Sequence, residues 1–281
     1  MSPSSKQKTI AEQVLFTGKG LQTGDIGKVV CRPAEPDTGI LFRRADIPDS
    51  PRLRVRDMLV VESFERRSAI GIGDASIQTV EHLMAALWGL EIDNILIEVY
   101  GEELPAMGGS AAEFMDLLRE HGIVQYPVSK KFIKIIKPIE VSAGDASIAL
   151  TPDEDFSVSY FIDYPCKSIG QEEFSIRLDP STFEKEIAPA RTFCLKKEAE
   201  ALLKAGLGAG ATLGNTLVMD DDGPIGNTLR FSNEPVRHKV LDIVGDLYLL
   251  GRPVKGKVQA RKSGHRLNMM MVRKIYEEYL A

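Results

Sequence analysis

Residues 233–247 read Asn-Glu-Pro-Val-Arg-His-Lys-Val-Leu-Asp-Ile-Val-Gly-Asp-Leu, and the interpretation of the whole chain starts from this stretch. Its apolar residues recur at helical spacing, which predicts a helix from about Glu234 to Leu250. His238, Asp242 and Asp246 lie at i, i+4 and i+8 and would share one helix face. Carboxylates on a mostly buried helix are costly unless they are paired or bound to a cation.

A similar helix is predicted earlier in the chain, over residues 76–90, with Thr79 as its N-cap. It carries His82 near its start, as the later helix carries His238, and a strand is expected after each helix. Turn and strand residues repeat at nearly the same spacing: Gly24-Asp25, Pro33 and Phe42 in the first half, and Gly144-Asp145, Pro152 and Phe161 in the second. The competing interpretation of this weak repeat is coincidence.

The repeat predicts an α+β fold of two similar domains, residues 1–127 and 128–281, with a boundary near 124–130. Such halves could place two similar helix starts across one cleft, where sites tend to lie. A further helix is predicted from Ser110, as N-cap with Glu113 three residues on, to a stop at Gly122. Residues 194–222, with a helical pattern and four glycines, form an extra element, which could serve packing alone.

The composition limits the class of protein. Hydrophobic residues are 43% and charged residues 27% of 281, which are ordinary globular values and exclude a disordered chain. The net charge of −5 argues against nonspecific nucleic-acid binding. No stretch approaches the ~18 apolar residues of a membrane span. Cys31, Cys166 and Cys194 lie far apart without a CxxC pair, and residues 1–8 are polar, unlike a signal peptide, so we expect a cytoplasmic protein. A monomer is expected, although no feature of the sequence fixes the oligomeric state.

The His238 and Asp242 pair is an HxxxD pattern, which can supply two zinc ligands from consecutive helical turns. A third ligand from elsewhere would leave the fourth position open, as in catalytic zinc sites. His82, His121 and His265 are the candidates for that ligand. A buried His–Asp pair with a purely structural role is the alternative. His121 precedes a helix-ending glycine, where a histidine suits the helix dipole, so a structural role is expected for it.

Two further residues could move protons. Glu81 directly precedes His82, and a carboxylate beside a metal site can act as general base. His265 is expected in a glycine-bearing, cationic loop, where it could be a proton donor instead of a ligand, especially if Asp246 keeps it charged. The cations of the same loop could hold a diphosphate, or simply form a solvated face. They are Arg261, Lys262 and Arg266.

Four longer strings resemble one known family. They are Thr79-Val-Glu-His-Leu-Met-Ala-Ala-Leu, Ala190-Arg-Thr-Phe, the 233–247 stretch and Ser263-Gly-His-Arg-Leu-Asn. In this order, and from Phe16-Thr-Gly-Lys-Gly to about Val272, the chain resembles the zinc-dependent UDP-3-O-acyl-N-acetylglucosamine deacetylases. These enzymes catalyse the committed step of lipid A synthesis in Gram-negative bacteria. The resemblance implies two α+β domains of like topology, packed helix layer against helix layer, with the active site between them.

The resemblance also implies roles for individual residues. His82, His238 and Asp242 would hold Zn²⁺, although Fe²⁺ also suits two histidines and a carboxylate. Glu81 would be the general base and His265 the general acid, oriented by Asp246. Thr192 would donate a hydrogen bond near the reacting carbonyl and Lys239 would contact the substrate. Residues 194–222 would form a passage for the acyl chain, with these candidate lining residues: Phe193, Leu202, Leu203 and Leu207.

The sequence departs from the family pattern at three positions. Gln22 and Cys166 stand where histidine is common, and Gly108 stands where aspartate is usual. Gln22 still donates a hydrogen bond but does not titrate. These departures keep two alternatives open: a related zinc amidohydrolase for another acylated or nucleotide-linked sugar, and a metal-bound scaffold or lipid carrier without turnover.

Overall fold

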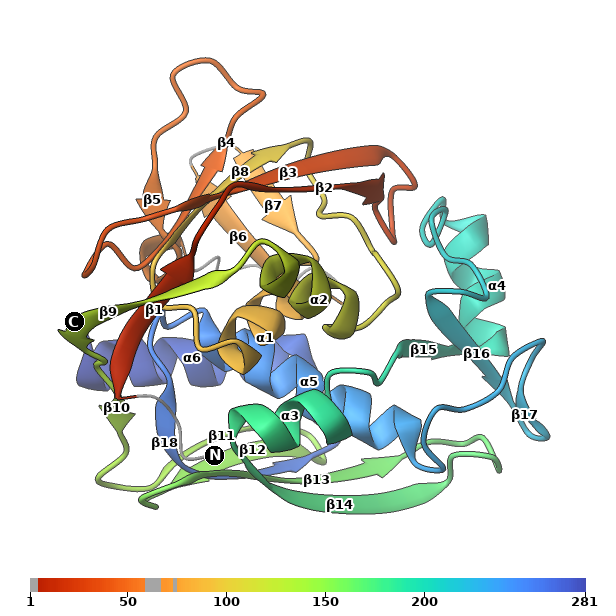
Figure 1. Ribbon diagram of the computed structural model, residues 1–281. Coiled ribbons are helices and arrows are strands. Elements are labelled where there is room, and N and C mark those ends of the chain that lie inside the picture. The colour runs from red at the N-terminus through yellow and green to blue at the C-terminus, as the bar shows by residue number, and fades with distance from the viewer. Residues whose placement is uncertain (1–4, 59–66, 73–74) are drawn as a thin grey trace.

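The computed structural model describes residues 5–58, 67–72 and 75–281, and it contains two mixed β-sheets with helices between them (Figure 1). The first sheet has the order β2–β3–β8–β4–β5. Its strands are β2 (Val14–Lys19), β3 (Ile26–Pro33), β8 (Ile95–Tyr100), β4 (Ile40–Arg44) and β5 (Leu53–Arg54). The second has the order β11–β12–β18–β13–β14. Its strands are β11 (Ile139–Ala143), β12 (Ala146–Thr151), β18 (Val254–Arg261), β13 (Phe156–Asp163) and β14 (Gln171–Leu178).

The two sheets have the same strand order and the same strand directions. In the first sheet, β2 and β3 form a hairpin, β3 pairs antiparallel with β8, and β8 is parallel to β4. In the second sheet, β11 and β12 form a hairpin, β12 pairs antiparallel with β18, and β18 is parallel to β13. Gly24-Asp25 lies in the β2–β3 turn and Gly144-Asp145 in the β11–β12 turn, as their repeated spacing predicts. The α+β class is thus confirmed. The proposed division at 127/128 falls within β9 (Ile123–Ser129), which pairs with β1 (Lys6–Ile10).

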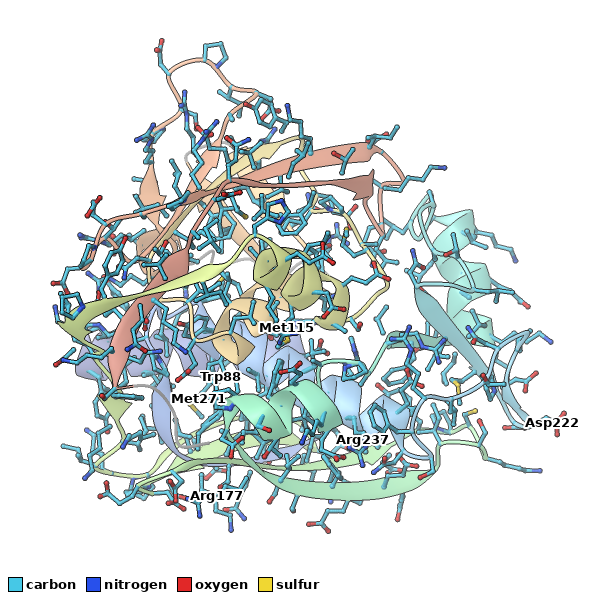
Figure 2. All side chains as sticks on the ribbon, viewed as in Figure 1. Trp88, Met115, Arg177, Asp222, Arg237 and Met271 are labelled. Carbon is cyan, nitrogen blue, oxygen red and sulfur yellow. The ribbon has the colours of Figure 1, made fainter. Side chains whose placement is uncertain are left out.

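The helices of the two halves meet between the sheets (Figure 1). Helix α1 (Glu81–Gly89) packs against α5 (Glu234–Tyr248), and α6 (His265–Tyr279) packs on α5. Helices α2 (Ala112–Glu120) and α3 (Pro180–Glu186) lie beside α1. Among the labelled side chains of Figure 2, Trp88, Met115 and Met271 lie in this helical layer, and Asp222 lies at the edge of the molecule.

Burial explains why these helices form here. Almost every residue of α1 is buried, including Leu83, Met84 and Leu87, because the helix packs against α5, α2 and α3. The extra element at 194–222 comprises β15 (Thr192–Leu195), α4 (Lys196–Lys204), β16 (Thr216–Asp220) and the short β17 (Gly223–Pro224). It stands to one side of the helical layer (Figure 1). Within the described part of the chain, no helix is both long and apolar enough to span a membrane.

Two predicted helix caps are wrong. Helix α1 begins one residue after Val80, not after Thr79, whose backbone is left-handed (φ 57°) and whose hydroxyl donates to Glu103 at 2.8 Å. Helix α2 has Ala111 as its N-cap, and the hydroxyl of Ser110 makes no hydrogen bond within the described residues. Both caps were inferred from side-chain preference, which tertiary hydrogen bonding and burial override.

The remaining strands are short. β10 (Ile133–Lys134) pairs with β18, and β6 (Ala69–Ile72) pairs with β7 (Ala75–Gln78) just before α1. Pro138 lies between β10 and β11, so residues 133–143 do not form one continuous strand. Of the polar stretch 1–8, residues 1–4 lie outside the described part.

Candidate active site

A cavity of about 520 Å³ lies between the halves and gathers most of the residues singled out from the sequence. From the first half, helix α1 contributes Glu81 and His82 to the cavity lining. The second half contributes residues of α5, of the 192–202 segment and of the 262–266 segment: His238, Lys239, Asp242, Thr192, Phe193, Leu202, Lys262, His265 and Arg266. The cavity lining does not include Arg261, Leu203, Leu207 or His121.

Three buried side chains form a cluster suited to a metal ion. One ligand atom each from His82, His238 and Asp242 lies within 4.8 Å of the others. The two imidazole ring centroids are 5.1 Å apart, and Nε2 of His238 is 3.3 Å from Oδ1 of Asp242. The helical spacing of His238 and Asp242 brings that pair together, and the contact between α1 and α5 adds His82. Among the three histidines considered for the third ligand, only His82 joins this cluster in the described residues.

The protonation of these side chains suits a cation. Burial lowers the pKa of His82 to about 3 and also lowers that of His238, so both rings are neutral near pH 7. Burial opposes the ionisation of Asp242, but electrostatic interactions with His238 and with the Lys239 ammonium outweigh it and hold the pKa of Asp242 below the usual range. Its Oδ2 accepts from Lys239 Nζ at 2.7 Å, while the buried Oδ1 has no hydrogen bond in the described residues. A buried carboxylate oxygen without a partner costs folding free energy unless a bound cation or a hydrogen-bond donor contacts it.

A hydrogen bond at the ring nitrogen that faces away from the cluster fixes the orientation of His238. Its Nδ1 donates to the carbonyl of Ala190 at 3.0 Å, which leaves Nε2 facing the cluster. A second contact of this kind orients most metal-binding histidines. The carbonyl is held in turn by Arg191, whose Nε donates to Glu234 at 2.9 Å and whose Nη1 donates to Asn227 at 3.0 Å. Arg191 and Glu234 both stand in the family motifs, but their local sequence predicts no role for either residue.

Glu81 and His265 face the same space. Nε2 of His265 lies 3.8 Å from Glu81 Oε1 and 3.8 Å from Asp242 Oδ2. Burial raises the pKa of Glu81 to about 7, and the charges of Asp246 and Asp242 add to this effect. Burial lowers the pKa of His265, but the carboxylates of Asp246, Asp242 and Glu81 outweigh it and raise that pKa to about 9. The site therefore pairs a carboxyl group with a histidine that carries a proton near pH 7.

Asp246 is the centre of a buried network that orients His265. Its Oδ2 accepts from His265 Nδ1 at 2.9 Å and from Asn268 Nδ2 at 2.8 Å, and its Oδ1 accepts from the hydroxyl of Ser68. The backbone N–H of Ser68 donates to Glu81 Oε2 at 3.1 Å. Sequence reasoning missed Ser68, because nothing in its local sequence marks it. Asn268 stood in a quoted motif without a role.

His265 lies on a helix, not in a loop as expected from its glycine-bearing surroundings. It is the first residue of α6, after Gly264 in an extended conformation. The apolar pattern Leu267, Met271, Val272 and Ile275, all buried, would have been the signal for this helix.

The predicted substrate contacts are placed unequally. Thr192 lines the cavity and is held by its backbone N–H, which donates to Gly109 O at 2.8 Å. Phe193 also lines it, 6.4 Å from the His238 ring between centroids, and Lys239 Nζ lies 5.8 Å from the Phe193 centroid. By contrast, the Leu203 side chain is 63% exposed, so it offers no wall to an acyl chain here.

The cations of the 261–266 segment differ in their surroundings. Lys262 Nζ lies 2.8 Å from both Asp145 and Asp163, so its charge is already balanced. Arg261 stacks on Phe161 with its guanidinium 4.2 Å from the ring centroid. Arg266 lines the cavity and makes no ion pair among the described residues. It is the best placed of the three for an anionic group.

The three departures from the family pattern also have distinct positions. Gln22 lines the cavity, and its backbone N–H donates to the buried carboxylate of Glu103 at 2.9 Å. A Cβ on Gly108 would lie 2.4 Å from Glu113 Oε1, so an aspartate there would meet a second carboxylate. Cys166 donates to the carbonyl of Asp220 at 3.0 Å and is not part of the cavity lining.

Comparison with known proteins agrees with the site. The family model described as "LpxC: UDP-3-O-acyl N-acetylglycosamine deacetylase" matches residues 7–277. A protein from Acidithiobacillus ferrooxidans named UDP-3-O-acyl-N-acetylglucosamine deacetylase is 41% identical over 95% of this chain and 89% of its own. Proteins of the same name from Anaeromyxobacter sp. and Brucella melitensis biotype 2 are 40% and 39% identical over 96% and 98% of this chain, and 88% and 96% of their own. The chain belongs to the UDP-3-O-acyl N-acetylglycosamine deacetylase family.

Proposed function

We propose that this protein hydrolyses the N-acetyl group of UDP-3-O-acyl-N-acetylglucosamine, giving UDP-3-O-acyl-glucosamine and acetate, the committed step of lipid A biosynthesis. One observation carries the proposal. Glu81 and His265, at 3.8 Å from each other, face the buried His82, His238 and Asp242 cluster in one cavity. The names of the curated relatives supply the substrate.

His82, His238 and Asp242 would hold a divalent metal ion in this cavity. Two neutral imidazoles and one ionised carboxylate suit Zn²⁺, which we propose as the resident ion, and they also suit Fe²⁺. The buried Oδ1 of Asp242, which accepts no hydrogen bond from the described part of the chain, supports a cation at this position. When bound, such an ion polarises a carbonyl group and acidifies water.

Glu81 and His265 divide the proton transfers between them. Ionised Glu81 takes a proton from the attacking water, whose oxygen forms a bond to the acetyl carbon. Protonated His265 gives its Nε2 proton to the sugar nitrogen as the C–N bond breaks, which releases the amine and acetate. Asp246 holds His265 charged and oriented through Nδ1, and the Thr192 hydroxyl would donate to the carbonyl oxygen as negative charge develops there.

The substrate would extend from this centre in two directions. Leu202, within the element at 194–222, and Phe193, just before it, would line the acyl passage. Arg266 would contact the diphosphate of the substrate at the other side of the cavity. Lys239 would contact the substrate while it balances Asp242. We keep the division into domains 1–127 and 128–281 as part of the proposal, together with a monomeric state and a cytoplasmic location. The three cysteines, all buried and without a disulfide, agree with that location.

The test is amine release from UDP-3-O-acyl-N-acetylglucosamine by purified protein that carries one equivalent of zinc. We expect activity that falls with a chelator and returns with zinc. Unacylated UDP-N-acetylglucosamine is the control substrate and should turn over far more slowly. Equal turnover of both would indicate an amidohydrolase for another sugar, and no turnover by folded, zinc-loaded protein would contradict the proposed activity.

A further inference from the structure

A second cavity, of about 200 Å³, lies apart from the catalytic one and shares no lining residue with it in the described chain. Segments of both halves form it, since residues 37–40, 54–56 and 93–94 meet residues 131 and 251–252. Its charged lining residues are Arg54, Arg56, Lys131, Arg252, Asp37 and Asp93. The lining is therefore net positive, although the whole chain has a net charge of −5.

Both carboxylates of this cavity already have partners. Asp37 Oδ1 lies 2.7 Å from Lys131 Nζ. Asp93 Oδ2 lies 3.3 Å from Lys130 Nζ and accepts from the backbone N–H of Lys8 at 2.9 Å. Asp37 also attracts Arg252, but with four cations and two carboxylates the lining stays net positive.

The three arginines have few partners of their own. Arg54 donates through Nε to the carbonyl of Thr38 at 3.2 Å, and Arg56 Nε is 3.7 Å from the exposed Asp57. Arg252 makes no hydrogen bond or ion pair with any residue in the ranges that the structure describes. Burial, and then the charge of Arg56, lower the pKa of Arg252, and the charge of Asp37 opposes them only in part. The guanidinium groups of Arg252 and Arg56 are thus close enough to repel.

Two buried side-chain amides, those of Asn94 and Gln7, also line this cavity and hydrogen-bond to its backbone. Asn94 is 1% exposed and Gln7 is 4% exposed. Asn94 accepts from the backbone N–H of Gly39 and donates to Gln7, both at 2.9 Å, and Gln7 accepts from the backbone N–H of Asp37 at 2.9 Å. This network fixes the turn at 37–39, where Asp37 and Gly39 have left-handed backbones. The hollow is thus preformed.

We propose that this cavity binds a phosphate group through Arg252, Arg56 and Arg54. Guanidinium groups present paired N–H donors that match phosphate oxygens, and a dianion supplies the counter-charge that the cavity lacks. The volume suits a phosphate or diphosphate group, with the rest of a larger ligand extending into solvent. The group comes from a small phosphorylated molecule or from a lipid headgroup, which share this chemistry. The site is independent of the proposed deacetylase activity.

The test is calorimetric titration of the zinc-loaded protein with inorganic phosphate and with pyrophosphate, at constant ionic strength. Arg252→Gln and Arg56→Gln should each weaken binding about tenfold, the value of one charge-assisted contact. Arg273→Gln is the matched control, because Arg273 lines neither cavity. Arg266→Gln removes the cation of the catalytic cavity and should leave this binding unchanged. A second arm measures co-sedimentation with phosphatidylglycerol vesicles, with phosphatidylcholine vesicles as control.

Binding that is lost in Arg252→Gln and Arg56→Gln and kept in Arg266→Gln supports the site. The same dependence seen only with phosphatidylglycerol vesicles also supports it and assigns the phosphate to a lipid headgroup. Binding equal in all variants, binding lost only in Arg266→Gln, or no binding of any probe would overturn the proposal. Thermal unfolding of each variant shows whether it is folded. If Arg252→Gln does not fold, the phosphate affinity of Arg56→Gln alone decides the proposal.

Discussion

Gly245 of helix α5 lies directly against the backbone carbonyl of Glu81 in helix α1: a Cβ at Gly245 would come within 2.0 Å of that oxygen. Only glycine permits this approach, because backbone cannot move aside as a side chain can. The contact brings the start of α1, with Glu81 and His82, against the part of α5 that carries Asp242 and Asp246. The short distances of the site depend on it.

Gly245→Ala is expected to destabilise the protein by about 1–3 kcal/mol, as overpacking does. In an exposed helix the same change would stabilise, since alanine is the better helix former. Zinc affinity should fall too, because the helices separate. Thermal unfolding and chelator competition measure both effects. Gly214→Ala, where the nearest atom to a Cβ is 3.6 Å away, is the control and should change neither.

Glu81→Gln is expected to lower turnover by about 10²–10⁴-fold, the usual contribution of a general base. Zinc content should be unchanged, because Glu81 is not among the three donors of the cluster. Steady-state kinetics and metal analysis test the two parts separately. Glu200→Gln, on the exposed face of α4, is the control. Undiminished turnover in Glu81→Gln would remove this residue as the base.

The pH–rate profile of kcat/KM should be bell-shaped. Activity rises with pH as Glu81 (pKa about 7) loses its proton, and it falls as His265 (pKa about 9) loses its own. A cation at the cluster favours both deprotonated forms, so each limb of the holoenzyme should lie below these values. Asp246→Asn removes a carboxylate that raises the pKa of His265, so its alkaline limb should move to lower pH. A profile flat from about pH 5 to 9 would contradict both assignments.

Glu234→Gln tests the support behind His238. Glu234 is fully buried and pairs with Arg191 at 2.9 Å, so loss of its charge leaves a buried guanidinium uncompensated and should cost about 3–5 kcal/mol. The displaced Ala190 carbonyl should also weaken zinc binding about 10–100-fold, as loss of such orienting contacts does. Unfolding and zinc competition measure these effects. Glu184→Gln, which breaks a half-exposed pair with Arg119, is the control. Unchanged zinc affinity would show that Glu234 has a structural role only.

Sequence reasoning predicted the α+β class and the repeated order of elements, because helical and turn spacing are local properties. The roles of the residues in the 520 Å³ cavity came from the family resemblance and stay predictions. Sequence reasoning placed His265 in a loop, because Gly264 and neighbouring cations obscured the helical pattern that follows. The ion pairs of Lys262 with Asp145, in the β11–β12 turn, and with Asp163, at the end of β13, join segments that are distant in the sequence, so local sequence could not predict them. Thr79 and Ser110 failed as caps for the same reason: their surroundings come from distant segments. Ser68 could be found only from three-dimensional structure.

The donors of the metal cluster are divided between the two halves, since His82 belongs to α1 and His238 and Asp242 to α5. An ion shared by them would act as a reversible cross-link between distant parts of one chain. Its free energy of binding would then also oppose separation of the halves. Neither half alone could keep a complete site, so the protein is expected to gain and lose its cofactor and its interdomain cohesion together.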